Sequence, residues 1–280
     1  MNSICNHCGQ GLPNPAPTRS RYQVLSKLGS GSNVGAFRAV DRKSGNEVAL
    51  KILLPAALSD NNRTLKQYQW EAKVLAKINH PNIASHVAIE DVDTLKVVIT
   101  ELLDGDSLES RLREGSISID EAIAVFHQVA KGLGAAHEQG VIHRNLKPRQ
   151  IHITTQGIVK VIDFRLAQCL RGATSKEALS GAVIGTPAYM SPEQTRGEAL
   201  DERTDVWAFG CCLFESLTGQ KPFNGESVAD LMKEVLESDP DFNGLPAETP
   251  SHVRSMLPRC LEKNPDARLR DLNDIAQWLR

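Results

Sequence analysis

The sequence contains no long hydrophobic run and no long run of charge of one sign. No window of 18 or more apolar residues is present, so we expect no membrane-spanning segment in these 280 residues. The first ten residues, MNSICNHCGQ, lack the basic start and apolar stretch of a secretory signal peptide. Lys+Arg number 32 and Asp+Glu 34, a balance that gives no support to a nucleic-acid or membrane-surface partner. We therefore expect a cytoplasmic protein whose partner is a small molecule or another protein.

Cysteine is sparse, with six residues at irregular positions. Cys211 and Cys212 are adjacent in an apolar helical run, so we expect reduced core thiols rather than a disulfide framework. Cys5 and Cys8 differ, because CNHCG has the C-x-x-C-G form of a zinc knuckle. Tetrahedral zinc needs four ligands, no second C-x-x-C follows, and His7 lies inside the turn. We expect no intramolecular Zn²⁺ site there; the alternatives are a site shared in a dimer and a degenerate zinc ribbon.

Internal repeats and low-complexity tracts are absent as well, and the length suits one large domain or two lobes around a cleft. We expect residues 1–20 to form a tail that carries the C-x-x-C knuckle and ends in a proline-rich linker. Residues 21–280 are predicted to form the folded domain. Its first lobe is placed at about 21–103 and its second at about 104–280, with a hinge near 101–105.

The first lobe reads as β-rich. Its strand-like runs, separated by turn signals, are YQVLSKL, VGAFRAV, EVALKIL and LKVVITEL. They predict an antiparallel sheet of about five strands. One helix interrupts them, TLKQYQWEAKVLAKI, which has Leu65, Tyr68, Ala72 and Leu75 on one face. Glu71 lies beside that stripe and is therefore expected near the sheet.

The second lobe reads as mainly helical. Ser118 and Glu121 predict a capping box at the start of a helix that ends at Gly140. Two short β-like pieces follow, QIHIT and IVKVID. The run DVWAFGCCLFESLT is apolar almost all round and closes at Gly219, so it is predicted to be the buried core helix. Amphipathic segments near 227–238, 251–262 and 271–279 complete this lobe.

Several short motifs occur in one order along this framework. They are LGSGSNVGAF at 28–37, VALK at 48–51, HRNLKPRQ at 143–150, VIDFR at 161–165, GTPAYMSPEQ at 185–194, DVWAFG at 205–210 and NPDAR ending at Arg268. With these motifs the chain, over residues 22–279, resembles the eukaryotic-type serine/threonine protein kinase domain in the form found in bacteria. The resemblance implies an α+β, two-lobed fold: a small antiparallel β-rich lobe with one key helix, and a larger, mainly helical lobe. It also implies an ion pair between Glu193 and Arg268.

In that family the glycine-rich loop covers ATP, a strand lysine holds its phosphates and an aspartate carries Mg²⁺. The resemblance places ATP or ADP on Leu28, Gly29, Gly31, Ala36, Ala49, Lys51, Thr100, Glu101, Leu103, His152 and Asp163. It assigns Lys51 a partner in Glu71, for which an ordinary surface ion pair is the alternative. Lys147, with Thr186 as its hydroxyl partner, matches serine/threonine rather than tyrosine kinases. Asp163 and Gln150 would hold Mg²⁺ or Mn²⁺.

Further positions match the family's regulatory and packing residues. Leu75, His143 and Phe164 correspond to a packed column that joins the lobes. The activation segment, residues 163–193, contains hydroxyls that Arg144 could pair with once phosphorylated, at Thr174, Ser175 and Ser180.

Six positions depart from the family pattern. Asn145 replaces the aspartate that accepts the substrate hydroxyl's proton, and an amide oxygen is a very poor base. Gln150 replaces an asparagine and carries its amide oxygen one methylene farther. Arg165 replaces a glycine, and Val34 stands at the third glycine-loop position, where Gly35 follows. Ala36 and His152 make the adenine sandwich smaller and more polar than usual.

General base catalysis is typically worth ~10²–10⁴-fold, whereas phosphoryl transfer draws most of its rate from positioning and electrostatics. The sequence therefore favours a pseudokinase that binds ATP, has impaired catalysis and acts in signalling or scaffolding through protein partners. One alternative is a slow serine/threonine kinase that acts on protein hydroxyls. Another is an interaction module that binds no nucleotide.

Overall fold

The structure is a computed structural model, and it describes residues 21–28, 36–53, 74, 77–92, 95–115, 117–164 and 187–280. Contacts along the chain divide it into two compact units. The first combines Met1–Leu65 with Ser85–Leu102, and the second combines Lys66–Ala84 with Leu103–Arg280. The domain boundaries expected from the sequence stay a prediction.

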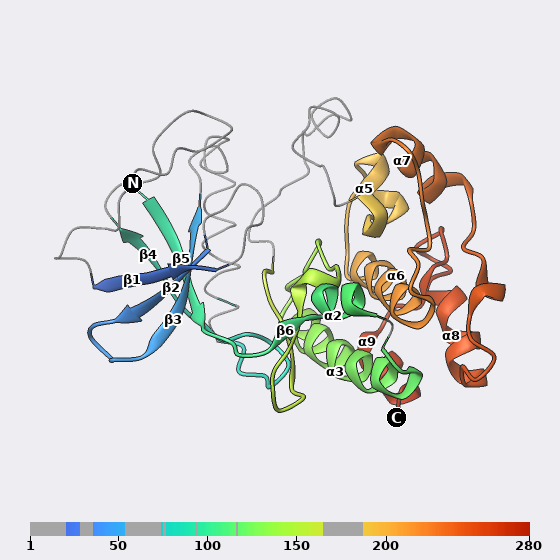
Figure 1. The fold of residues 1–280 in the computed structure, drawn as a ribbon. Helices are drawn as coiled ribbons and strands as arrows, with labels where there is room; N and C mark the ends of the chain where they lie inside the picture. Colours follow the sequence, from blue (N-terminus) through green and yellow to red (C-terminus); the bar gives the residue numbers. More distant parts are fainter. Residues whose placement is uncertain are drawn as a thin grey trace. The chain divides into compact units, whose positions relative to one another are not determined.

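The first unit contains an antiparallel sheet in the order β1-β2-β3-β5-β4 (Figure 1). Its strands are β1 (Tyr22–Lys27), β2 (Ala36–Asp41), β3 (Glu47–Leu53), β4 (His86–Val92) and β5 (Leu95–Glu101). The predicted five-stranded antiparallel sheet is confirmed. The run HVAIEDV of β4 was not singled out from the sequence, because acidic residues interrupt its apolar alternation. Most of the helix expected at 64–78, including Glu71, lies outside the described residues.

A small apolar core covers one face of this sheet. Strand alternation places Val48 and Leu50 of β3 on that face, and Ala39 and Ile99 pair with them across the neighbouring strands. All four side chains are buried. The opposite face therefore carries the residues between them, and these include the predicted nucleotide contacts.

The second unit begins with a small sheet and two helices. Strands β6 (Asp106–Ser107), β7 (Ile151–Ile153) and β8 (Val159–Val161) pair in that order, so the two short β-like pieces are confirmed. Helix α2 (Leu108–Glu114) follows β6, and α3 (Ile119–Glu138) follows α2. The 3₁₀ turn η2 (Pro148–Gln150) leads directly into β7.

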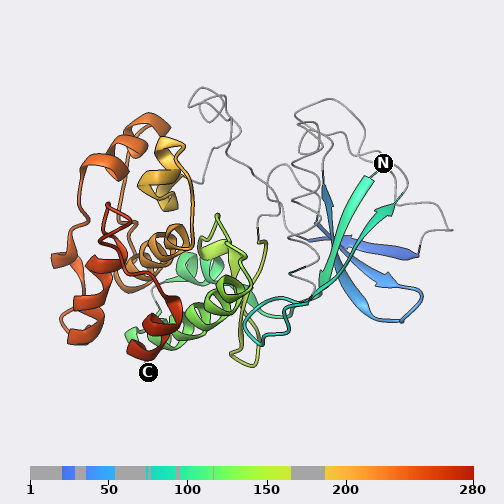
Figure 2. The ribbon, with the colours of Figure 1, turned by 180° about the vertical axis from the view of Figure 1, so that it is seen from behind.

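Helix α6 (Arg203–Thr218) is the centre of the second unit's core. It is buried along almost its whole length and ends at Gly219 with φ 71°, as predicted. Phe209 of α6 packs edge-on against Phe126 of α3, with ring centroids 5.2 Å apart. The remaining elements are η3 (Pro187–Tyr189), α5 (Pro192–Arg196), α7 (Val228–Glu237), η4 (Phe242–Gly244), α8 (Ser251–Cys260) and α9 (Leu272–Trp278). The three amphipathic helices are confirmed, and the C-terminal α9 packs against α3 (Figure 2).

The capping box predicted for α3 is only half present. The Ser118 side chain accepts a hydrogen bond from the backbone N–H of Glu121 at 3.2 Å. The Glu121 carboxylate instead pairs with Arg111 of α2 at 2.7 Å, so the reciprocal bond to Ser118 is not formed. The Glu121 carboxylate thus forms a tertiary ion pair in place of the local capping hydrogen bond.

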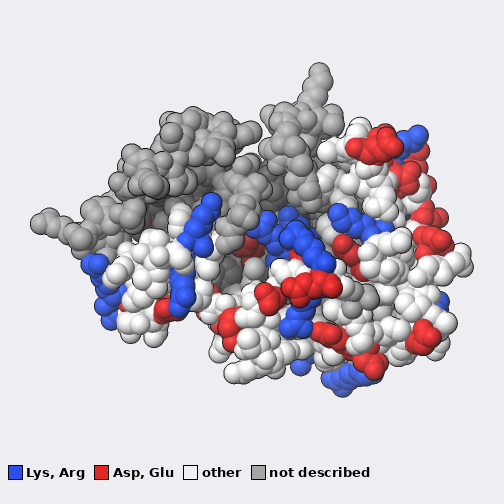
Figure 3. All heavy atoms as spheres, in the orientation of Figure 1, with Lys and Arg blue, Asp and Glu red and all other residues white. Residues whose placement is uncertain are grey.

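The surface and the thiols agree with the composition. Positive and negative side chains are interspersed on the face of the described residues that Figure 3 shows. Cys211, Cys212 and Cys260 are buried and unbonded, and burial raises the pKa of all three thiols. Across the described ranges, no helix has the length and apolar character that a bilayer crossing requires.

Candidate active site

The centre of the site is the loop that runs from α3 to η2. His143 of this loop is fully buried, and burial lowers its pKa. Its Nε2 lies 3.0 Å from the carbonyl oxygen of Ile162, and its Nδ1 accepts the backbone N–H of Asn145 at 3.3 Å. The ring also packs on Phe164, with centroids 4.7 Å apart, as the resemblance predicted. His143 is therefore a neutral packing residue with its Nε2 protonated.

A single buried carboxylate fixes the backbone of this loop. Asp205 of α6 accepts the backbone N–H of His143 at 2.7 Å and that of Arg144 at 2.8 Å. His137, at the end of α3, donates to the same carboxylate at 2.8 Å. Burial alone would raise the pKa of Asp205, yet the hydrogen bonds from His137 and from the backbone N–H of His143 lower it. These bonds hold Arg144 at φ 62°, a conformation that non-glycine residues rarely adopt.

A second tie reaches the loop from α5. The Gln194 side-chain Nε2 donates to the carbonyl oxygen of Arg144 at 2.9 Å. Sequence reasoning missed both Gln194 and His137 as site residues. His137 lies within an ordinary amphipathic helix, and only the packing of α3 on α6 brings it to Asp205.

The two altered amides of the loop have buried oxygens without partners. Asn145 Oδ1 and Gln150 Oε1 receive no hydrogen bond in the structure. Gln150 is only 5% exposed, and its backbone is fixed by bonds to Lys147 and Ile162. Because an unsatisfied buried acceptor costs free energy, such oxygens are suited to a cation or to a donor on a ligand.

Asp163 lies two residues after the end of β8, in the same unit. Its φ of 61° makes it the second non-glycine residue of the described ranges with a positive φ, beside Arg144. Uncommon backbone conformations of this kind cluster at functional sites. Asp163, Asn145 and Gln150 are thus present on the second unit as the resemblance predicts, while their roles stay predictions.

The first unit presents its predicted nucleotide residues on one face of the sheet. Ala36 pairs with Lys51 across β2 and β3, and Ala49 pairs with Thr100 across β3 and β5. Directly opposed residues, and residues two apart on one strand, share a face. These four side chains therefore lie together, opposite the small core. Leu28 is next to them, because its N–H bonds the carbonyl of Ala36 at 2.7 Å.

The end of β5, the residues directly after it and β7 carry the remaining predicted contacts. Glu101 is fixed to Ser85 by two bonds, one from its backbone N–H at 3.1 Å and one to its carboxylate at 2.7 Å. Leu103 is half-buried, and His152 lies at the middle of β7. Several predicted residues lie outside the described ranges: Cys5, His7, Cys8, Gly29, Gly31, Val34, Gly35, Glu71, Leu75, Arg165, Thr174, Ser175, Ser180 and Thr186.

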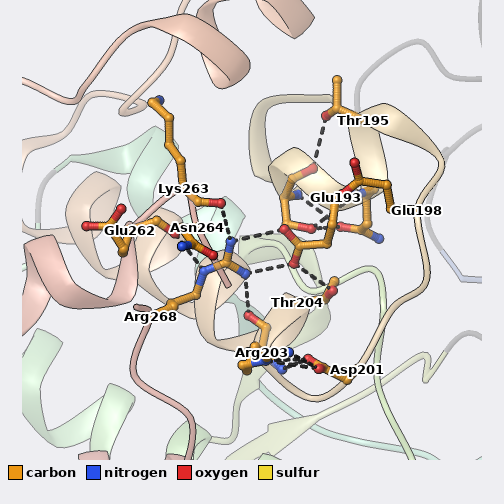
Figure 4. A network of polar contacts seen from close by, with 12 residues as sticks. Glu193, Thr195, Glu198, Asp201, Arg203, Thr204, Glu262, Lys263, Asn264 and Arg268 are labelled. Atoms are coloured by element: carbon orange, nitrogen blue, oxygen red, sulfur yellow. Dashed lines mark hydrogen bonds and ion pairs between the residues drawn. The ribbon is translucent and has the colours of Figure 1, made fainter. Parts of the chain in front are cut away.

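A buried ion pair fixes the start of α5. Arg268 NH1 and NH2 lie 2.7 Å and 3.0 Å from the two oxygens of Glu193, so the predicted pair is confirmed (Figure 4). Thr204 donates to the same carboxylate at 2.9 Å. Burial would raise the pKa of Glu193, but the bond from Arg268 lowers it. Helix α5 is thus anchored at its start to α6 and to the loop before α9.

A comparison with known families agrees with this arrangement. A family profile described as protein kinase domain matches residues 22–278. The chain belongs to the protein kinase domain family. The sheet of the first unit, the loop from α3 to η2 and the Glu193–Arg268 pair are therefore parts of a protein kinase domain. We call the loop from α3 to η2 the catalytic loop, after its place in the family.

Several relatives of this kinase domain come from bacteria. It is 31% identical over 258 residues to a Clostridium perfringens protein named probable serine/threonine-protein kinase, covering 91% of this chain and 37% of that protein. It is 34% identical over 266 residues to a Corynebacterium efficiens protein of the same description, covering 91% and 40%. It is 32% identical over 267 residues to serine/threonine-protein kinase PknB of Mycobacterium tuberculosis, covering 92% and 42%. The chain spans about two-fifths of the length of these relatives.

Proposed function

We propose that this kinase domain binds ATP and transfers its γ-phosphate slowly to serine or threonine hydroxyls of proteins. The observation that carries the proposal is the catalytic loop: Asp205 fixes its backbone, and the Asn145 amide oxygen is buried without a donor. The family and the named relatives support a phosphotransferase. They offer no support for the impaired catalysis that the sequence favoured.

Asn145 has a defined part in such a transfer. The substrate hydroxyl oxygen attacks the γ-phosphorus, the bond from that phosphorus to the bridging oxygen breaks, and ADP leaves. The Asn145 oxygen accepts a hydrogen bond from the hydroxyl and so orients it, but it does not take the proton at neutral pH. The proton passes to water or to the transferred phosphoryl group. The expected penalty is the ~10²–10⁴-fold that a general base contributes.

The residues present also fit a divalent metal ion. The buried, unpartnered oxygen of Gln150 and the carboxylate of Asp163 would hold Mg²⁺ or Mn²⁺. Such an ion neutralises phosphate charge when bound. In this proposal Lys51 binds the phosphates, while Lys147 acts near the acceptor hydroxyl.

A second candidate is a nucleotide-binding scaffold that transfers no phosphate. It is favoured by the replacement of two loop residues at once, because Asn145 and Gln150 bear on separate tasks, proton acceptance and metal holding. Its partners would be proteins that bind the helical unit.

Phosphate transfer from radiolabelled ATP to a Ser/Thr peptide pool, with Mg²⁺ and with Mn²⁺, tests the proposal. We expect a weak wild-type signal that Lys51→Ala abolishes, while Lys131→Ala, an exposed lysine of α3, leaves it unchanged. The Asn145→Asp/Gln150→Asn variant should be faster by ~10²–10⁴-fold.

Each contrary result has a distinct meaning. A wild-type protein that is inactive but stabilised by millimolar ATP in a thermal shift assay supports the scaffold. If the protein transfers no phosphate from ATP and ATP does not stabilise it in the thermal shift assay, both candidates are ruled out.

A further inference from the structure

His152 faces away from the core of the second unit. Its neighbours on β7, Ile151 and Ile153, are buried, and strand alternation directs the residue between them to the other face. The ring is partly exposed. The resemblance puts leucine or methionine at this position, beneath the adenine.

A hydrogen bond fixes the orientation of this ring. His152 Nε2 lies 2.6 Å from the backbone carbonyl oxygen of Asp104. A carbonyl oxygen can only accept, so Nε2 carries the proton and donates. Neither leucine nor methionine can make this bond. The histidine therefore joins β7 to Asp104, which lies within the predicted hinge.

The chain around Asp104 is held on β7 at further points. The Asp104 carboxylate accepts the hydroxyl of Thr155. Gly105 has φ 84°, and a side chain there would overlap the carbonyl oxygen of Ile153 and lie 2.8 Å from Thr154 Cα. Ser107 of β6 pairs with His152 itself. Residues 104–107 thus lie flat against β7.

We propose that His152 is a positioning residue that prepares this kinase domain for the base of a purine nucleotide. The inference rests on the proposed nucleotide binding. The bond to Asp104 fixes the chain directly after Glu101–Leu103, the backbone expected to bind adenine. A segment ordered before binding loses less conformational freedom when the ligand arrives, which raises affinity. The gain in affinity is therefore expected from contacts of the base and not from contacts of the phosphates.

Three substitutions separate the bond from the ring. His152→Gln keeps a donor, His152→Phe keeps a flat ring without a donor, and His152→Leu has neither. Calorimetry with ADP measures the whole ligand, and inorganic tripolyphosphate serves as a probe without a base. Loss of one neutral hydrogen bond corresponds to roughly 2- to 10-fold in Kd. We expect this loss for ADP in the Phe and Leu variants, and wild-type affinity in the Gln variant.

Further readouts distinguish positioning from general damage. Tripolyphosphate affinity should be unchanged in all three variants, and KM for ATP should rise while kcat stays constant. His252→Phe, an exposed histidine of α8, is the matched control. Thr155→Val removes the other side-chain bond to Asp104 and should likewise raise the Kd for ADP. This variant tests the proposal even if a His152 variant does not fold.

The proposal is overturned if the Phe and Leu variants bind ADP as the wild type does, or if tripolyphosphate affinity falls with that of ADP. If the wild type binds ADP and only the role of His152 fails, the proposed function stands. A wild-type protein that binds neither ADP nor ATP contradicts both the proposed function and the role of His152.

Discussion

At the scale of single residues, Glu193 and Arg268 form the most buried arginine–carboxylate pair among the described residues. The Arg268 side chain is wholly buried and that of Glu193 is 4% exposed. Removing one partner leaves an uncompensated buried charge, which typically costs 3–5 kcal/mol. We therefore predict that Arg268→Met lowers the free energy of unfolding by about 4 kcal/mol, as measured by urea denaturation.

The control for this prediction is an ion pair on the surface. Glu109 and Arg113 pair at 3.0 Å along α2, and the Arg113 side chain is 73% exposed. Arg113→Met should change stability by less than about 0.5 kcal/mol. Similar losses in the two variants would contradict the view that burial makes the Glu193–Arg268 pair costly to break.

At the scale of elements, the contact of α3, the catalytic loop and α6 predicts a dependence of stability on pH. Burial lowers the pKa of His143, so the folded protein keeps this ring neutral. In the unfolded chain the ring titrates near the ordinary histidine pKa of 6.5. Below that pH the unfolded state binds a proton that the folded state does not. The free energy of unfolding should fall by up to about 1.4 kcal/mol per pH unit between pH 6.5 and the folded-state pKa.

Asp205 acts in a lower pH range. Its folded-state pKa lies below the ordinary aspartate value of 3.8, so its contribution to stability is present above pH 3.8 and is lost as pH falls through the folded-state pKa. Urea denaturation between pH 8 and 4.5 therefore excludes the contribution of Asp205, whereas Glu215, whose pKa burial raises, adds a slope of the opposite sign that both histidine variants share. His143→Leu should flatten the slope below pH 6.5, whereas exposed His252→Leu should retain it; equal slopes would refute the assignment. His80, whose pKa burial also lowers, accounts for a residual slope.

The elements themselves were predictable wherever one periodicity dominates. The apolar run of α6 and the amphipathic patterns of α7 to α9 are local signals, and so are those of most strands of the first unit. Strand β4 does not, because pairing with β5 rather than alternation defines it. The capping box of α3 failed for a related reason, since Arg111 lies close only in the folded state.

The site shows the same division. Motif order supplied the identities of Asn145, Gln150 and Asp163, and the strand register then gathered the nucleotide residues of the first unit on one sheet face. The bonds from His137 and His152 could not be predicted. Each joins residues far apart in sequence, and neither histidine belongs to a repeated pattern.

At the scale of the whole molecule, the buried apolar side chains described here form two separate clusters. One covers the sheet of the first unit and includes Ile99, while the larger one surrounds α3 and α6 and includes Phe209. Stability is not uniform when a chain contains separate cores, and each can open as its own unit. The smaller cluster buries less apolar surface among these residues, so its unit should open more readily.

Hydrogen exchange followed by mass spectrometry tests this difference. We predict faster exchange in β1, β2, β3 and β5 than in α3 and α6. Ile99→Ala should cost about 2–5 kcal/mol and speed exchange in the sheet alone, and Phe209→Ala about 3–5 kcal/mol in the helical unit. If either substitution accelerates exchange equally in both units, the kinase domain opens as one cooperative body. If faster exchange is confined to the mutated unit, the two units open independently. A ligand bound to one unit then stabilises the other unit only if the ligand also contacts that other unit.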